Sequence, residues 1–180
     1  MYPSDLELSI FHYFNDWPAS LHAIFAIITL GGGVSTALLV WVVVAYGLAG
    51  RRASLATATA GIVAWILAQV AKMMMERPRP QAILDNLNIY GHQYDTWSFP
   101  SGHATFVAAC AVTVALYAKP KHWPWLALVI LLVGISRVYL GAHFPLDVIA
   151  GWALGSVIAV MFKSLFDRHL GAPAPNKAKN

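Results

Sequence analysis

Long apolar runs separated by short polar breaks dominate the chain. A helix that crosses a bilayer needs about 20 mostly apolar residues. Four segments of the chain suit this role, namely residues 54–75, 101–118, 123–140 and 145–166. The pattern therefore predicts an all-α, polytopic membrane helical bundle.

The first apolar stretch, residues 21–50, is longer than a single span requires. Three successive glycines, residues 31–33, interrupt it, and glycine runs are typical of turns. We interpret the stretch as a short apolar helix followed by a spanning helix over residues 34–50. Whether residues 18–31 also cross the membrane stays open, so the prediction is five to six transmembrane helices.

Composition supports a membrane protein. Hydrophobic residues make up 58% of the chain and charged residues only 11%, whereas soluble domains carry about 25% charged residues. We expect a single domain over residues 1–170, with a disordered cytoplasmic tail over residues 171–180. The lone cysteine, Cys110, cannot form an internal disulfide. No basic tract interleaved with aromatic residues indicates nucleic-acid binding, and the sequence leaves the oligomeric state open.

Cations are distributed unevenly between the two ends of the predicted spans. If the spans alternate in direction, one end carries Arg51, Arg52, Lys119, Lys121, Lys163, Arg168, Lys177 and Lys179. The other end carries Lys72, Arg77, Arg79 and Arg137. Because cytoplasmic loops hold the excess of Lys and Arg, the second end is expected outside. This predicts a multi-pass protein of the inner (plasma) membrane with its site on the periplasmic or extracytoplasmic face.

Three polar strings fall on the predicted external face, and the first is "KMMMERPRP". Lys72 and Arg79 are seven residues apart, so on a continuing helix they would share a face. Pro78 and Pro80 indicate that the helix ends near here. The ordinary alternative is a pair of cations that snorkel at a helix end. Arg77 is the weaker candidate because it need not share the face of Lys72.

The second string is "PSGH", residues 100–103. Pro100 and Ser101 suit a helix start, and Gly102 permits close approach to the backbone. Free N–H groups at a helix N-terminus bind anions, and His103 in the first turn has a proton to donate to a bound group. The alternative is a capped helix with an interfacial histidine.

The third string is "SRVYLGAHFPLDVIAG". Arg137 lies near the end of one span, His143 follows a glycine-containing turn, and Asp147, four residues after His143, begins the next span. On a helix that spacing lets the carboxylate hold one ring nitrogen, which leaves the other nitrogen available as a nucleophile or base. The alternative is a structural His–Asp pair beside an unrelated arginine.

Together the strings predict a phosphate site. Three cations that converge on one place need an anion with more than one charge. One histidine would attack phosphorus and the other would protonate the leaving oxygen; the residues alone do not decide which, although Asp147 favours His143 as the attacking group. A metal site is disfavoured, because acids are few, no HxxH or HxH cluster occurs, and the cations would repel a divalent ion. We therefore expect metal-independent chemistry without a cofactor.

The combined strings resemble the type 2 phosphatidic acid phosphatase family of integral membrane lipid phosphatases, which shares its site with vanadium haloperoxidases. The family pattern is Lys-x6-Arg-Pro, then Pro-Ser-Gly-His, then Ser-Arg-x5-His-x3-Asp. Every spacing matches here: Lys72 with Arg79-Pro80, Pro100-Ser101-Gly102-His103, and Ser136-Arg137 with His143 and Asp147.

The resemblance implies a role for each matched residue. His143 would be the nucleophile that forms a phosphohistidine, Asp147 would orient it, and His103 would be the general acid. The phosphate-binding residues would be Lys72, Arg79, Ser101, Gly102 and Arg137.

The substrate is expected to be a membrane lipid phosphate. With its small size and external site, the chain resembles bacterial members of this family that act on undecaprenyl pyrophosphate. The resemblance implies hydrolysis of undecaprenyl pyrophosphate to undecaprenyl phosphate. Phosphatidylglycerophosphate, phosphatidic acid and lipid A phosphates are alternatives, and a lipid phosphotransferase or a non-catalytic transporter of anionic lipid are rivals from other classes. The loop over residues 81–97 carries Tyr90, His92, Tyr94 and Trp97; an interfacial aromatic belt is favoured over a role in headgroup choice.

Overall fold

Helices account for the regular structure of the part of the chain that is described. A computed structural model describes residues 2–89 and 96–170. Its α-helices are α1 (Asp5–Asn15), α2 (His22–Leu30), α3 (Val34–Met75), α4 (Gly102–Tyr117), α5 (Trp123–Tyr139) and α6 (Pro145–Leu170). The all-α prediction is confirmed, and the predicted tail over residues 171–180 lies outside the described residues.

The bundle is a membrane protein. Three helices in the described ranges are long and apolar enough to cross a bilayer: Val34–Met75, Pro120–Tyr139 and Pro145–His169. Large apolar side chains also lie on the outside, as with Leu39 and Met74, whose exposed fractions are 74% and 78%. A bilayer would cover this surface. The count of five to six spans stays a prediction.

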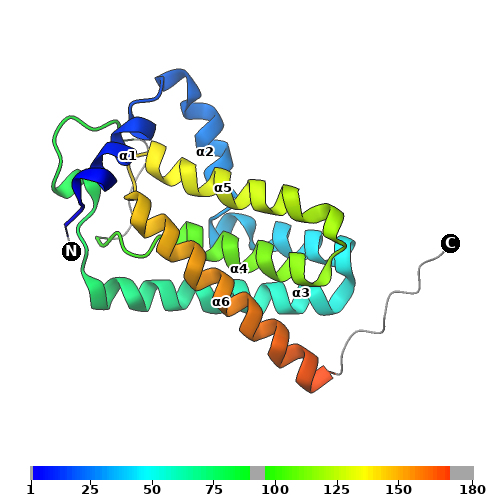
Figure 1. Cartoon of the computed structure of the whole chain (residues 1–180). Helices are drawn as coiled ribbons and strands as arrows, with labels where there is room; N and C mark the ends of the chain where they lie inside the picture. The colour runs from blue at the N-terminus through cyan, green and yellow to red at the C-terminus, as the bar shows by residue number, and fades with distance from the viewer. Residues whose placement is uncertain (1, 90–95, 171–180) are drawn as a thin grey trace.

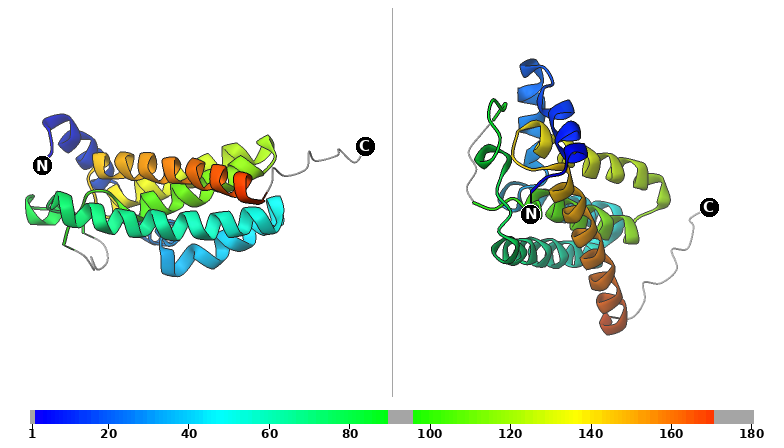
Figure 2. Two further views of the ribbon diagram at one scale, coloured as in Figure 1. Left: turned by 90° about the horizontal axis from the view of Figure 1, so that it is seen from below. Right: turned by 60° about the vertical axis from the view of Figure 1, so that its left-hand side comes forward.

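Helix α3 turns back on itself at Gly50. This residue has φ 82° and ψ −175°, which interrupts the helical backbone. The Ser54 hydroxyl donates to the carbonyl of Val42 over 2.8 Å, although in a straight helix residues twelve apart would be about 18 Å apart. The left view of Figure 2 shows the two arms of α3 meeting at one end of the bundle. The break predicted between residues 50 and 54 is therefore present.

Helix α4 lies at the centre, between α3, α5 and α6 (Figure 1). Its side chains are buried on nearly all sides. Small residues let α6 approach it closely: a Cβ atom at Gly155 would come 2.2 Å from the carbonyl oxygen of Thr105, and one at Gly151 would come 2.8 Å from that of Ser101. Close backbone approach through small residues is typical of helix packing in membranes. Here the close approach of the two backbones holds the first turn of α4 against α6.

Helices α1 and α2 lie at the end of the bundle where α4 and α6 begin (Figure 1). The Phe11 ring of α1 packs on the Phe144 ring, with 5.4 Å between centroids. The buried Asn15 side chain donates to the carbonyls of Tyr139 and Asn88. At nine residues α2 extends about 14 Å, which is less than the hydrocarbon core of about 30 Å. Helix α2 is therefore too short to cross the bilayer by itself, and it lies with α1 at this end of the molecule.

Candidate active site

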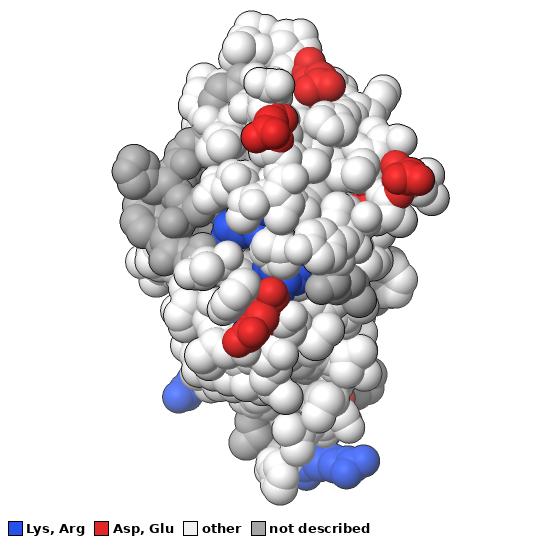
Figure 3. All heavy atoms as spheres, turned by 90° about the vertical axis from the view of Figure 1, so that its left-hand side faces the viewer, with Lys and Arg blue, Asp and Glu red and all other residues white. Residues whose placement is uncertain are grey.

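A polar cavity of about 480 Å³ lies at the end covered by α1 and α2. Six of the residues predicted from the sequence line it, namely Lys72, Arg79, Gly102, His103, Arg137 and His143. Two more, Ser101 and Asp147, are fully buried and do not line it. In Figure 3, which looks at this end of the molecule, basic atoms show in the middle of the face, with acidic side chains around them.

Three cations lie in the cavity, and each is at least nine-tenths buried. Lys72 belongs to the last turn of α3, which ends at Met75, so Arg79 lies in the following loop rather than on a continuing helix. The Arg79 Nη1 group donates to the carbonyl of Ala142 over 2.6 Å. Burial lowers the pKa of Arg79 to about 10, against the opposing effect of the Asp147 charge. Arg79 therefore stays charged at neutral pH.

Arg137 is held in the cavity from α5. Its Nη1 group donates to the hydroxyl of Thr29 over 2.8 Å. Its Nε group is buried and has no hydrogen-bond partner among the described residues. The carbonyl of Arg137 accepts from the backbone N–H groups of Ala142 and His143, at 3.0 and 3.2 Å. Arg137 thus both supplies a cation and fixes the turn that carries His143.

His143 lies in the turn between α5 and α6, not on a helix. Helix α6 begins at Pro145, in agreement with the predicted span over residues 145–166, and proline is favoured at the first helical position. His143 therefore precedes the helix, so the helical geometry considered for the His143–Asp147 pair does not apply. The carboxylate nevertheless comes to the Nδ1 side of the ring, with 3.6 Å between Nδ1 and Oδ2. This is longer than a hydrogen bond. The Oδ2 atom accepts from the Phe144 N–H group over 2.9 Å.

The His143 ring is neutral at neutral pH. Burial lowers its pKa well below the ordinary value, and four neighbouring groups lower it further, namely Arg79, Lys72, Arg137 and His103. A neutral imidazole has a lone pair available for attack on phosphorus. The cavity therefore combines the charged guanidinium of Arg79 with an uncharged histidine.

His103 lies in the first turn of α4, as the sequence predicted. Ser101 is the N-cap residue of α4, and its hydroxyl accepts from the N–H group of Ala104 over 3.4 Å. Gly102 and His103 follow it and line the cavity. A helix N-terminus of this kind favours a bound anion through its free N–H groups and its dipole. The predicted helix start is confirmed, whereas contact of Ser101 with phosphate stays a prediction.

Several cavity residues were not predicted from the sequence. They are Leu30, Gly32, Gly33, Val34, Ser35, Thr36, Trp65 and Gln69. A Cβ atom at Gly32 would come 2.6 Å from the Val133 side chain and 3.0 Å from Cβ of His103, so only glycine fits there. Trp65 and Gln69 precede Lys72 by seven and three residues, a spacing that places all three on one helix face. That spacing is the feature of the sequence from which Trp65 and Gln69 could have been predicted as cavity residues.

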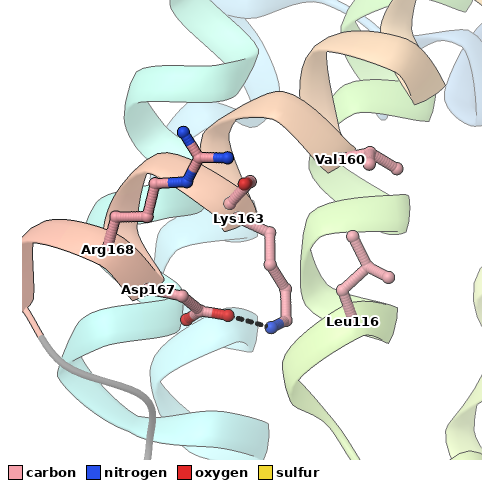
Figure 4. A pocket seen from close by; sticks show the side chains of 6 residues that line it. Leu116, Val160, Lys163, Asp167 and Arg168 are labelled. Carbon is pink, nitrogen blue, oxygen red and sulfur yellow. Dashed lines mark hydrogen bonds and ion pairs between the residues drawn. The ribbon is translucent and has the colours of Figure 1, made fainter.

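A second cavity, at the opposite end of the bundle, is less suited to bind an anion (Figure 4). Two cations line it, Lys163 and Arg168. Lys163 lies 2.5 Å from the Asp167 carboxylate, and Arg52 lies 3.2 Å from the same carboxylate. A carboxylate thus offsets part of the positive charge in this cavity, whereas none of the described residues that line the polar cavity is acidic.

The loop over residues 81–97 is described only in part. Tyr90, His92 and Tyr94 lie outside the described residues. Trp97 forms an isolated bridge with Pro78, and the Ser98 N–H group donates to the carbonyl of Arg77. The loop therefore returns to the end of α3, and the proposed aromatic belt stays a prediction.

The chain is similar to known lipid phosphatases. An undecaprenyl-diphosphatase of Sulfolobus acidocaldarius is 42% identical over 102 residues, which are 56% of this chain and 48% of that protein. Phosphatidylglycerophosphatase B of Bacillus subtilis is 36% identical over 114 residues, 57% of this chain and 53% of that protein. The crystal structure of Aquifex aeolicus LpxE superposes with a TM-score of 0.72 at 26% identity, covering 91% of this chain and 99% of that one.

The chain spans about half the length of the curated relatives that it matches. The family model of the PAP2 superfamily matches residues 49–170. The matched region contains all three strings that predicted the site, and the residues of these strings converge on one cavity and its wall. The chain therefore belongs to the PAP2 superfamily.

Proposed function

We propose that this chain is an integral membrane lipid phosphatase that works through a phosphohistidine on His143. The observation that carries the proposal is one cavity lined by three buried cations, two histidines and the N-terminus of α4. Such a cavity suits an anion with more than one charge, and phosphate fits this description. The proposed phosphate-binding residues are Lys72, Arg79, Ser101, Gly102 and Arg137.

The proposed reaction has two steps. In the first step His143 attacks the terminal phosphorus and forms an N–P bond, while the P–O bond from that phosphorus to the rest of the substrate breaks, and His103 donates a proton to the departing oxygen. In the second step water attacks phosphorus, the N–P bond breaks, and His103 accepts the proton of the water. Asp147 stabilises the positive charge on the ring of His143. Fixed cations supply most of the catalysis, because phosphoryl transfer depends on positioning and charge stabilisation.

An apolar groove next to the cavity supports a lipid substrate. Its volume is about 540 Å³, and it is lined by residues of α2, α3 and α5. Leu30 and Thr36 line both the groove and the polar cavity, so the two lie side by side. A substrate with a phosphate in the cavity would thus have its hydrocarbon tail in the groove.

Undecaprenyl diphosphate is the proposed substrate, and its product would be undecaprenyl phosphate. The similarity to the undecaprenyl-diphosphatase of Sulfolobus acidocaldarius supports this choice. The similarity to a phosphatidylglycerophosphatase supports phosphatidylglycerophosphate as the second candidate, with phosphatidic acid and lipid A phosphates after it. We further propose that residues 1–170 form one domain in the inner membrane, with the cavity on the external face.

A substrate panel tests the proposed function. We expect the detergent-solubilised protein to release phosphate from undecaprenyl diphosphate faster than from phosphatidylglycerophosphate, phosphatidic acid or lipid A. The rates should be unchanged by EDTA, because cations of the chain replace a metal in the cavity. Activity that EDTA removes and added Mg²⁺ restores would contradict metal-independent chemistry. Transfer to a lipid acceptor without free phosphate would indicate a phosphotransferase, and binding without turnover would indicate a transporter.

Filling the groove should weaken binding of long tails. Val129 of α5 lines the groove, whereas the neighbouring Leu128 does not and is 42% exposed. We expect Val129→Trp to raise KM for a long-chain lipid phosphate about tenfold, which corresponds to ~1.4 kcal/mol of lost contact. KM for dioctanoyl phosphatidic acid should change little, because a short tail needs less of the groove. Equal effects of Val129→Trp and Leu128→Trp on both substrates would contradict the assignment.

A further inference from the structure

A buried guanidinium joins two carboxylates behind the cavity. The Arg77 side chain is 1% exposed and does not line the cavity. Its Nη1 group donates to Oδ1 of Asp147 over 2.6 Å, and its Nη2 group donates to Oε2 of Glu7 over 2.7 Å. Charge-assisted bonds of this length are strong, and the planar guanidinium fixes the angle between them. Because these two groups are directed at carboxylates, Arg77 is not a phosphate-binding residue.

Glu7 connects the Arg77–Asp147 pair to helices α1 and α6. It belongs to α1 and is 8% exposed. Its Oε1 atom accepts from the N–H group of Leu146 in the first turn of α6 over 3.0 Å. Glu7 therefore holds Arg77 through one oxygen and the start of α6 through the other.

Both carboxylate oxygens of Asp147 therefore accept hydrogen bonds. Oδ1 accepts from Arg77, and Oδ2 accepts from the Phe144 N–H group and faces Nδ1 of His143. The Arg77 guanidinium also lies over the Phe144 ring, 4.8 Å from its centroid. A carboxylate fixed at both oxygens cannot rotate away from the histidine ring.

We propose that Arg77 and Glu7 are positioning residues for the reaction of His143 and that they act by holding the carboxylate of Asp147 in place. The inference rests on the proposed function of the cavity. Helix α1 is then part of the catalytic unit, although the match to the family model begins at residue 49 and leaves Glu7 outside it.

The arrangement also balances charge around His143. The groups that face its ring are Lys72 of α3, Arg79 of the loop after α3, His103 of α4, Arg137 of α5 and Asp147 of α6. Behind this set, the one positive charge of Arg77 lies between the two carboxylates. Without Arg77, the uncompensated carboxylates would stabilise the protonated ring. The pKa of His143 would rise, and activity would be lost at a higher pH as the solution is acidified.

Four variants test the proposal: Arg77→Gln, Arg77→Lys, Glu7→Gln and the control Asp5→Asn, which removes a carboxylate from an exposed position of α1. The assay follows hydrolysis of dioctanoyl phosphatidic acid in detergent across pH, with kcat expressed per folded protein. For Arg77→Gln we expect kcat to fall about 10- to 100-fold, by analogy with the loss of a hydrogen-bond partner behind a metal-bound histidine. KM should change less than threefold, and the acid limb of the pH profile should move to higher pH.

The other variants separate charge from geometry. Arg77→Lys keeps the positive charge but loses the planar guanidinium whose two Nη groups bind the two carboxylates. The acid limb should therefore return toward that of the wild type, while kcat stays reduced. Glu7→Gln should lower kcat about 3- to 10-fold without moving the acid limb to higher pH, because the positive charge of Arg77 then faces only one carboxylate, that of Asp147. Asp5→Asn should match the wild type.

Two outcomes would overturn the inference. The first is that Arg77→Gln and Glu7→Gln both keep the wild-type kcat per folded protein and the wild-type acid limb of the pH profile, even if their thermal stability is lower. The other is a change in KM alone, which would place these residues in substrate binding. A wild-type protein that hydrolyses none of the lipids of the substrate panel would instead refute the proposed function, so the two failures are distinguishable. If Arg77→Gln fails to fold, Arg77→Lys and Glu7→Gln decide the result by the same measurements.

Discussion

His143→Ala should lower kcat for phosphate release by at least about 10⁴-fold, because removal of a nucleophile eliminates the covalent route. The protein should remain folded, since alanine fits in a turn whose backbone is held by the carbonyl of Arg137. With substrate labelled at phosphorus, the wild-type protein quenched in alkali should carry acid-labile label, and His143→Ala should carry none. Rate and label together identify the attacking residue.

His169→Ala is the matched control, because His169 is exposed near the end of α6. It should retain wild-type kcat and labelling. Label that persists in His143→Ala and disappears in His103→Ala would reverse the two proposed roles. Full activity of His143→Ala without label would mean that water attacks phosphorus directly.

The sequence predicted the helices of the bundle well because proline and glycine mark their ends. The expected segment 101–118 corresponds to α4 at Gly102–Tyr117, and 123–140 corresponds to α5 at Trp123–Tyr139. In both cases a proline lies near the start of the helix, where its fixed φ angle is favourable. Local chain chemistry was therefore sufficient to find these elements.

Contacts between distant segments could not be predicted in the same way. Glu7 lies 70 residues before Arg77 in the chain, and an acidic residue in a polar first helix is usually solvated. The sequence makes Arg77 a weaker candidate than Lys72 and Arg79, because it need not share the face of Lys72. Arg77 does not line the cavity, but its contact with Asp147 could not be seen from the sequence. Only the three-dimensional arrangement of α1, α3 and α6 gives these residues a role.

The position of His143 shows a second limit. Its spacing from Asp147 would bring the two side chains together if both residues lay on one helix, but the helix begins at Pro145, after the histidine. The carboxylate still reaches the ring because Asp147 is in the first turn of α6, and its backbone N–H and that of Val148 bond to the carbonyl of Phe144. Spacing predicted the pair, whereas the local backbone decided its geometry.

His103→Ala should separate proton donation from attack. We expect kcat for a lipid phosphate to fall about 10²- to 10⁴-fold, the usual contribution of general acid catalysis. The loss should be much smaller for p-nitrophenyl phosphate, because its leaving group departs as a stable anion and needs no proton. His143→Ala should be inactive toward both substrates, since the nucleophile is required whatever the leaving group.

The comparison of the two substrates decides between roles that the cavity permits for His103. Its ring lies in the first turn of α4 beside Lys72, Arg79 and Arg137, so a purely electrostatic role would affect both substrates equally. A general acid affects only the substrate whose oxygen must be protonated on departure. Equal losses for p-nitrophenyl phosphate and phosphatidic acid in His103→Ala would therefore assign His103 to phosphate binding. A selective loss for phosphatidic acid would assign it to proton transfer in the first step.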